Sequence, residues 1–381
     1  MINEGPHLKV LQVIPSLGCN ARCSFCHIWG KTGWAHHEPA NSSKEDIHLP
    51  SLFRFIDEAI AHTPGNTFWL LITGGEALLY KNLEALLVFA RNKRLPVILL
   101  TNGLLLKKYA SLLVDNVCSL SVSIDGPPAV HNNIRGISDL YNRACEGIEM
   151  VINLKRQRNS FTPTIVLNCV ISPVNAMYIN EMIDALEERF KNKGIHFKVD
   201  QDVSEANDIS VYFEPLLYTT TVLGNRYETF MKDHFKINVS NSWKGFVNNK
   251  FDFDIKQVKA IVQKYYQRYH TNAGSFVDLE EYFGNVFNTF GRKCLTPWHN
   301  LTVREDGNAY LCPDYKDYSL GNIQSDSFTD IWMGEKAIKF RNLAAQHLLP
   351  VCYRCCGLFL DYTLPTFKLP AAKQRASIPI F

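Results

Sequence analysis

The chain has 381 residues, long enough for one large domain and a smaller one. Of these residues 46% are hydrophobic and 20% charged, as in ordinary globular proteins. Its formal net charge is only +3, from 40 basic and 37 acidic residues, and no basic block stands out, so we expect no nucleic-acid or membrane partner. No apolar run approaches the roughly 18 to 20 residues that cross a bilayer, and the N-terminus shows no signal-peptide pattern, which predicts a cytoplasmic protein.

The chain has 11 cysteines and no export signal, which predicts metal binding rather than a disulfide framework. One group of cysteines lies near residue 20 and a second group lies between residues 294 and 356. Cys118, Cys145 and Cys169 are scattered in strand-like or helix-like contexts, so we expect them in the core.

Strand-like and helix-like segments alternate from residue 8 to about residue 218. Continuous apolar strands separated by amphipathic helices indicate a parallel sheet covered by helices. Six such units predict an α/β fold, a partial (β/α)6 barrel with its chemistry at one mouth. The expected strands are Leu8–Pro15, Thr67–Thr73, Pro96–Thr101, Val117–Ile124, Thr164–Ile171 and Ile195–Asp200, and the expected helices lie near 49–62, 82–94, 104–115, 138–157 and 176–190.

A cysteine motif of C-x3-C-x2-C spacing follows the first apolar run, at Cys19, Cys23 and Cys26. Three thiolates on one short loop suit three corners of an iron–sulfur cube, because soft sulfur ligands select such clusters, and one iron is left without a protein ligand. Two alternatives stay open from the spacing alone. One is a zinc loop with His27 as fourth ligand, and the other is a set of buried structural thiols.

Glycines and a carboxylate follow the second strand, in Thr73-Gly74-Gly75-Glu76. Gly74 and Gly75 let the backbone approach a ligand closely, and Glu76 can accept a hydrogen bond from an ammonium group. Taken alone, this motif is equally a bare turn. After the third strand, Thr101-Asn102-Gly103 predicts a turn.

Further polar residues follow the fourth strand. Ser123 and Asp125 can bind hydroxyl groups, and Arg135 can pair with a carboxylate in bidentate fashion. The alternative for each of them is a solvated loop residue that caps a helix.

The order and spacing of these motifs make residues 8 to about 218 resemble the core of the radical S-adenosylmethionine (SAM) enzymes. The resemblance implies that the three cysteines of the loop bind a catalytic [4Fe–4S] cluster whose open iron binds SAM. It also implies that Glu76, within Gly74-Gly75-Glu76, holds the methionine amino group. The residues that would contact the carboxylate or ribose of SAM are Ser123, Asp125 and Arg135, and those that would pack on adenine are Val170 and Ile171.

The second cysteine group lies in residues 291–365. Cys294 precedes an expected β-hairpin centred on Glu305-Asp306-Gly307, Cys312 follows it, and Cys352 and Cys355 form a C-x2-C loop. Four thiolates suit either tetrahedral zinc or a fully ligated iron–sulfur cluster, and spacing alone does not separate the two.

Behind a radical SAM core, the C-x12-G-x4-C pattern resembles the SPASM/twitch extension. The resemblance implies one auxiliary [4Fe–4S] cluster, bound by Cys294, Cys312, Cys352 and Cys355. Cys356 is left over as an alternative ligand, an inert thiol or a hydrogen-atom donor to a substrate radical. We expect a core at 1–218, a helical insertion or linker at 219–290, the auxiliary-cluster domain at 291–365 and a tail at 366–381.

The resemblance implies an enzyme that reductively cleaves SAM to a 5′-deoxyadenosyl radical and abstracts hydrogen from a substrate C–H bond, leading to oxidation or epimerisation. An electron donor such as flavodoxin or ferredoxin is implied. Cys19 lies near the N-terminus, with no room for a preceding peptide-binding domain, which favours a small molecule such as a sugar or aminoglycoside. The alternatives are a maturase of ribosomally made peptides and, from other classes, a non-catalytic electron carrier or a zinc scaffold.

Overall fold

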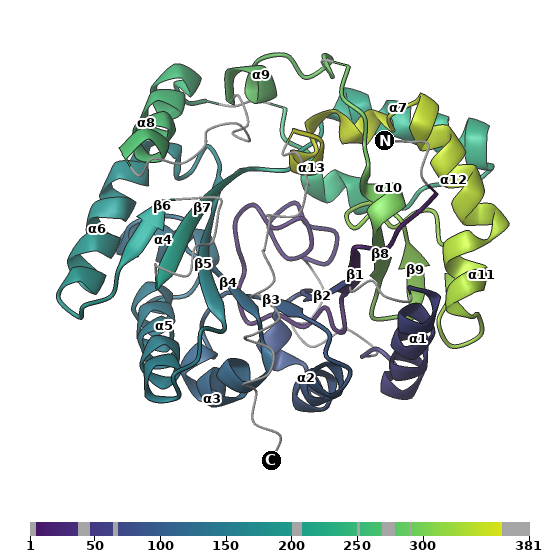
Figure 1. Ribbon diagram of the computed structural model, residues 1–381. Helices are drawn as coiled ribbons and strands as arrows, with labels where there is room; N and C mark the ends of the chain where they lie inside the picture. The colour runs from purple at the N-terminus through teal and green to yellow at the C-terminus, as the bar shows by residue number, and fades with distance from the viewer. Residues whose placement is uncertain are drawn as a thin grey trace.

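A curved sheet surrounded by helices forms the protein (Figure 1). The computed structural model describes residues 5–36, 46–63, 68–199, 208–249, 252–268, 279–289 and 291–359. The predicted tail at 366–381 lies outside these residues. The division of the chain into four parts stays a prediction.

The strands lie in an arc, and the purple loop that follows the first strand lies inside it (Figure 1). The strands are β1 (Val10–Val13), β2 (Trp69–Ile72), β3 (Val97–Thr101), β4 (Ser119–Ser123), β5 (Thr164–Ile171), β6 (Phe197–Val199), β7 (Ile209–Pro215), β8 (Asn300–Val303), β9 (Asn308–Tyr310) and β10 (Gly321–Asn322). Among the described residues they form one sheet in the order β10-β9-β8-β1-β2-β3-β4-β5-β7-β6. Every pairing from β8 to β6 is parallel, whereas β9 is antiparallel to both of its neighbours.

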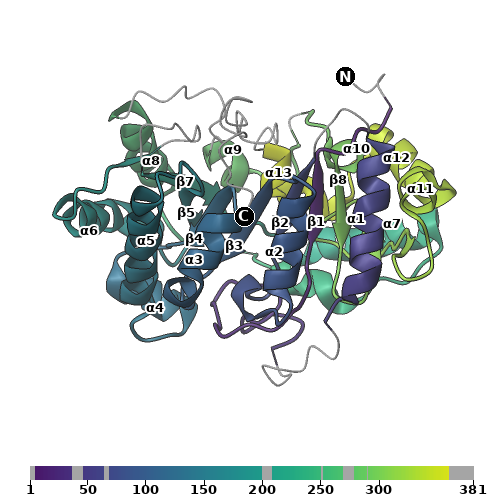
Figure 2. The ribbon, with the colours of Figure 1, turned by 60° about the horizontal axis from the view of Figure 1, so that its bottom comes forward.

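Helices cover the outer face of this sheet (Figure 2). They are α1 (Leu49–His62), α2 (Leu83–Asn92), α3 (Leu106–Asn116), α4 (Pro128–Arg135), α5 (Leu140–Gln157) and α6 (Ile179–Lys191), with the short helices η1 (Ala77–Leu79) and η2 (Ala176–Tyr178). Each helix expected between strands is present within a few residues of its predicted bounds. The prediction of an α/β fold with a partial barrel is confirmed.

The second half of the chain is mostly helical. It contains α7 (Thr221–Phe235), η3 (Asn241–Phe246), α8 (Ile255–Arg268), α9 (Leu279–Gly284), α10 (Thr296–His299), α11 (Phe328–Met333), α12 (Glu335–Gln346), η5 (Pro350–Arg354) and α13 (Cys356–Phe359). No helix in the described part of the chain has the length and apolar character to cross a bilayer.

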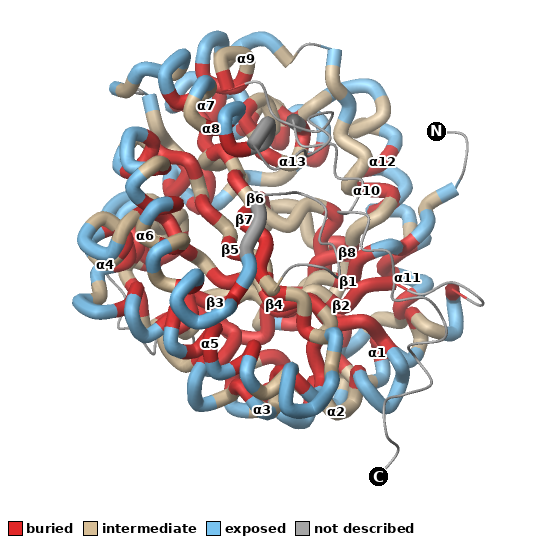
Figure 3. Tube along the Cα trace, turned by 60° about the vertical axis from the view of Figure 1, so that its left-hand side comes forward, coloured by how far each residue is buried: buried red, intermediate tan, exposed pale blue. Residues whose placement is uncertain are grey.

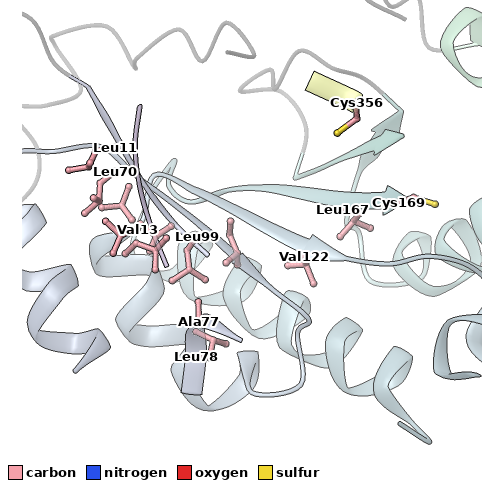
Figure 4. Close-up of a cluster of buried hydrophobic side chains, with 14 of the residues drawn as sticks. Leu11, Val13, Leu70, Ala77, Leu78, Leu99, Val122, Leu167, Cys169 and Cys356 are labelled. Carbon is pink, nitrogen blue, oxygen red and sulfur yellow. The ribbon is translucent and has the colours of Figure 1, made fainter. Parts of the chain in front are cut away.

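The two faces of the sheet have different characters because strand side chains alternate. Leu11 and Val13 of β1 are completely buried against the helices, whereas Gln12 between them faces the inside of the arc and is half-buried. The same alternation continues along the parallel strands, whose buried positions stand out in Figure 3. Leu70, Leu99 and other apolar side chains point from the strands toward the helices in Figure 4. The main core therefore lies outside the arc, and the inside is left for half-buried polar groups.

The sixth position of the barrel differs from the prediction. We expected Ile195–Asp200 there, but β6 lies at the sheet edge, and β7 stands between it and β5. β7 pairs with β5 along seven residues and buries Val211 and Phe213, whereas β6 has only three residues. The longer strand therefore has more backbone bonds and more apolar surface to bury next to β5.

The predicted hairpin is present as β8 and β9, but it does not stand apart from the core. β8 pairs in parallel with β1, so the sheet continues from the first strand into the C-terminal region. Arg54 of α1 donates to the carbonyl oxygens of Ile323 and Asp326, and Glu58 accepts from the amide of Phe328 at 2.7 Å. The C-terminal region is thus fastened to both the first strand and the first helix.

We expect Leu301→Ala in β8 to lower the free energy of unfolding by about 2–5 kcal/mol, because it empties a completely buried position between β1 and the C-terminal region. Urea denaturation should show one transition that shifts as a whole. Ile338→Ala is the control, since Ile338 is 49% exposed, and its effect should stay within about 0.5 kcal/mol. Two separate transitions, only one of which shifts, would contradict this prediction.

Candidate functional site

A cavity of about 280 Å³ lies at the carboxyl ends of the parallel strands. Most of the predicted site residues line it, because these strand ends all meet at one mouth. The predicted residues on its wall are Cys19, Cys23, Cys26, Gly74, Gly75, Glu76, Ser123, Arg135 and Val170. Asp125 and Ile171 are completely or almost completely buried behind the wall.

The cysteine loop follows β1 and is folded by its own backbone. The Cys26 amide donates to the Cys23 carbonyl at 3.1 Å, and the sulfurs of Cys19 and Cys26 accept from the amides of Ala21 and Trp29 at 3.4 and 3.3 Å. Burial raises the pKa of Cys19 to about 12 and also raises the pKa of Cys23, where Arg135 opposes the rise. These thiols therefore hold their protons until a metal displaces them.

The Gly74-Gly75 turn lies directly against the cysteine loop. The amides of Gly75 and Glu76 donate to the carbonyls of Ser16 and Gly18 at 3.2 and 2.8 Å. A Cβ atom on Gly75 would lie 2.3 Å from the carbonyl oxygens of Leu17 and Gly18, closer than any real contact. Glycine at position 75 is therefore required by the approach of the cysteine loop, a reason that the motif alone did not reveal.

Glu76 is a buried carboxylate held by three donors. It accepts from the Leu78 amide at 3.0 Å, the Thr101 hydroxyl at 2.7 Å and the Asn102 amide at 2.8 Å. Burial raises the pKa of Glu76, and these hydrogen bonds oppose the rise. The Asn102 side chain also donates to Asn20 in the cysteine loop at 2.8 Å. The Thr101-Asn102-Gly103 segment, expected only as a turn, thus fixes both Glu76 and the loop.

Asp125 and Arg135 form a buried ion pair behind the cysteine loop. Nε and Nη2 of Arg135 lie 2.6 and 2.5 Å from Oδ2 of Asp125, and Nη1 donates to the sulfur of Cys23 at 3.5 Å. The other oxygen of Asp125 accepts from the Val170 amide at 3.1 Å. Asp125 therefore orients Arg135 and does not reach the cavity, whereas sequence patterns suggested a ligand contact.

His131 supports the same pair from α4. Its Nδ1 accepts from the Asp125 amide at 3.1 Å, and its Nε2 is buried without a hydrogen-bond partner among the described residues. Burial lowers the pKa of His131 to about 3, with a contribution from the Arg135 charge. The imidazole is therefore neutral in the folded protein at physiological pH.

Glu214 at the end of β7 lines the cavity and was not among the predicted site residues. Its carboxylate accepts from the Cys356 thiol at 3.0 Å and from the Asn168 side chain at 3.2 Å. The alternation in Ile209–Pro215 would have placed Glu214 on the inner face if that segment had been recognised as a strand. In Figure 4 the Cys356 side chain lies across the strands from the apolar side chains that face the helices.

The second cysteine group also comes together. Burial is the largest cause that raises the pKa of Cys352, and the thiols of Cys312, Cys294 and Cys355 raise this pKa further. Cys355 likewise adds to the rise at Cys294, whose pKa reaches about 11, mainly through burial. The four side chains come from separate segments of residues 294–355, and all four pack against the main hydrophobic core.

Both cysteine groups have a donor set that suits an iron–sulfur cube. Among the described residues, no group of three or more His, Cys, Asp or Glu side chains has the spacing to hold a single metal ion. A zinc ion needs sulfurs that converge at about 2.3 Å, whereas a cube binds each cysteine through a different iron. His27, the alternative zinc ligand, stacks on Phe246 with ring centroids 4.2 Å apart.

Comparison with known protein families gives two matches. Residues 13–186 match the radical SAM superfamily, and residues 294–356 match SPASM, an iron–sulfur cluster-binding domain. Together the matched residues make up more than half of the chain. Each match contains one of the two cysteine groups.

Several characterised relatives resemble most of the chain. The cysteine-type anaerobic sulfatase-maturating enzyme of Clostridium perfringens is 23% identical over 89% of this chain and 84% of its own length. The serine-type enzyme of Bacteroides thetaiotaomicron is 23% identical over 90% of this chain and 78% of its own length. The sporulation killing factor maturation protein SkfB of Bacillus subtilis is 23% identical over 82% of this chain and 62% of its own length.

Solved structures share the fold. The anaerobic sulfatase-maturating enzyme anSMEcpe, with bound AdoMet, has a TM-score of 0.52 at 19% identity and covers 93% of this chain and 88% of its own. Streptococcus suis SuiB, bound to its precursor peptide SuiA, has a TM-score of 0.54 at 14% identity and covers 86% of this chain. This chain spans 65% of the SuiB chain.

We expect Gly75→Ala to displace the cysteine loop, because the added Cβ would overlap backbone carbonyl oxygens that have no room to move. Iron per chain after anaerobic reconstitution should fall by about four atoms, the content of one cube. Gly284→Ala is the matched control, since a Cβ at position 284 meets no atom within 4 Å. Unchanged iron content in Gly75→Ala would contradict the prediction.

Acidification should destabilise the protein through His131. Its folded pKa of about 3 lies below the ordinary value of 6.5, so between these pH values the unfolded chain binds a proton that the folded chain excludes. The stability contributed by neutral His131 is complete above pH 6.5 and is lost as the pH falls toward 3. From pH 6.5 to pH 5, the wild type should lose about 2 kcal/mol more than His131→Asn in urea denaturation. His196→Asn, at an exposed histidine, should behave like the wild type.

Proposed function

The chain belongs to the radical SAM superfamily and carries a C-terminal SPASM domain, and on this premise we propose that it oxidises a residue of a peptide or protein substrate. It is a radical SAM enzyme, whose cofactors are a [4Fe–4S] cluster, SAM and auxiliary iron–sulfur. We assign its site to the cavity whose wall contains the three loop cysteines together with Glu76 and Arg135.

We assign the catalytic cluster to Cys19, Cys23 and Cys26, which leaves one iron open for SAM. When bound and reduced, the cluster and SAM supply a 5′-deoxyadenosyl radical that abstracts hydrogen from a substrate C–H bond. The protein's part is binding, orientation and electrostatics. The buried carboxylate of Glu76 would accept hydrogen bonds from the amino group of SAM, and three donors hold the carboxylate in place.

Arg135 is suited to the carboxylate of SAM. A guanidinium has five N–H groups, and the contacts of Arg135 with Asp125 and Cys23 use three of them. One N–H on each terminal nitrogen remains for a carboxylate. Apolar residues complete the wall, among them Phe25, Leu217 and Phe246.

We assign the auxiliary cluster to Cys294, Cys312, Cys352 and Cys355, which pack against the same hydrophobic core and influence one another's pKa. Cys356 donates its S–H to Glu214, and it is Glu214 that lines the cavity. This contact supports a role for Cys356 in holding Glu214, and the role of Cys356 as a hydrogen-atom donor to a substrate radical stays a prediction.

The nature of the relatives favours a peptide or protein substrate over the small molecule that the position of Cys19 suggested. The names of the sulfatase-maturating enzymes and of SkfB refer to maturation, and the structure of SuiB was solved with a precursor peptide bound. The sulfatase-maturating enzymes of Clostridium and Bacteroides resemble this chain over 89% and 90% of its length.

The anaerobically reconstituted chain should contain about eight iron atoms, as two cubes require. With a low-potential reductant it should convert SAM to 5′-deoxyadenosine and methionine, measured by liquid chromatography. Replacing Cys19, Cys23 and Cys26 together by alanine should abolish 5′-deoxyadenosine and leave about four iron atoms. A chain that binds no iron, or a triple variant that still cleaves SAM, would refute the proposed function.

The substrate is tested with short peptides that differ only in Cys, Ser or Ala at one central position. A Cys or Ser peptide should change mass in a SAM-dependent reaction, with 5′-deoxyadenosine formed in proportion, and the Ala peptide should not. SAM-dependent conversion of aminoglycosides, with all peptides unchanged, would refute a peptide substrate while leaving the enzyme class intact.

A further inference from the structure

The end of α4 is fastened to the cysteine loop by main-chain bonds. The Arg22 amide donates to the Arg135 carbonyl at 3.1 Å, and the Ser24 amide donates to the Ile134 carbonyl at 2.8 Å. Gly136 follows in the left-handed region, with φ of 69°, which ends the helix at this point. The backbone of Arg135 is therefore held beside the loop independently of the contacts that its side chain makes.

The side chain of Arg135 is directed at one sulfur. Asp125, which is completely buried, binds Nε and Nη2, and this fixes the plane of the guanidinium. Nη1 then lies 3.5 Å from the sulfur of Cys23 and donates to it. The Phe25 ring lies 5.7 Å from the guanidinium carbon and shields the contact on another side.

The guanidinium keeps its charge in this place. Arginine does not lose its proton in proteins, and the Asp125 carboxylate stabilises the charged form. Only 8% of Arg135 is exposed, so water screens its field weakly, and a charge in such a place acts strongly on its neighbours.

We propose that Arg135 raises the reduction potential of the catalytic cluster through its hydrogen bond to the Cys23 sulfur, and that Asp125 positions it for this. The inference rests on the proposed assignment of Cys23 as a ligand. Reduction adds one electron, supplied by an external low-potential donor, to a cluster whose sulfurs already carry negative charge. A cationic hydrogen bond to a ligand sulfur stabilises this more negative state, and such bonds are among the factors that set cluster potentials.

Arg135 would thus have two tasks in the same reaction, one toward SAM and one toward the cluster. Arg135 lines the cavity, and two of its N–H groups are not used by Asp125 or Cys23 and are available to SAM, while Nη1 contacts the sulfur of Cys23. SAM binding and ease of reduction are thereby coupled through the position of a single guanidinium.

The test is a redox titration of the full-length, anaerobically reconstituted chain without SAM, followed by electron paramagnetic resonance. The variant lacking Cys19, Cys23 and Cys26 supplies the auxiliary-cluster signal for subtraction. Arg135→Gln should lower the potential of the catalytic cluster by about 59 mV, which is a tenfold change in the ratio of reduced to oxidised cluster for one electron. Arg135→Lys, which keeps the charge without the fixed fork, should lie between Arg135→Gln and the wild type.

Arg22→Gln is the matched control. Arg22 lies in the same loop and carries the same charge, but it donates to the carbonyls of Cys19 and Ala21 and stacks on Trp29. Its replacement should shift the potential less than that of Arg135. Equal shifts in Arg22→Gln and Arg135→Gln, or no shift in Arg135→Gln, would overturn the proposal.

Loss of the catalytic cluster from both Arg135 variants would also overturn the proposal, because Arg135 would then be needed for assembly and not for tuning. A wild-type chain without a catalytic-cluster signal would instead refute the proposed function. The two failures are therefore distinguishable.

Discussion

The close approach of two backbones organises the site. The carbonyl oxygens of Leu17 and Gly18 stand where a side chain at position 75 would begin, so the cysteine loop can lie on the Gly74-Gly75 turn only because position 75 has none. This contact fixes the height of the loop above the strand ends. Glu76 then follows the turn, on the wall of the same cavity as the three cysteines.

The neighbouring strands hold the same loop from other sides. Asn102, after β3, binds Asn20, and Arg135, on the helix after β4, binds Cys23. The segments after β2, β3 and β4 thus each contact the cysteine loop and each contribute residues to the cavity wall. These polar groups form a connected frame, in which Thr101 donates to Glu76 and Asp125 accepts from Arg135.

Much of the fold could be predicted because apolar runs and helical periods are local signals. The cysteine motif and Gly74-Gly75-Glu76 are local as well, and the cavity brings them together. The pairing of β8 with β1 and the insertion of β7 next to β5 could not be predicted, because pairing partners depend on total buried surface and not on either segment alone. Glu214 was not predicted as a site residue because β7 was not recognised as a strand. The burial of Asp125 behind the cavity wall likewise depends on the bonds it makes with Arg135 and Val170.

The parallel pairing of β1 with β8 has a consequence for biosynthesis. The outer edge of Val10–Val13 acquires its neighbour, Asn300–Val303, only after most of the polypeptide has left the ribosome. Until then the nascent chain presents an unpaired strand edge next to an iron-binding loop, a state prone to strand-to-strand aggregation. This edge is exposed for as long as translation to residue 303 takes, and the finished molecule conceals it.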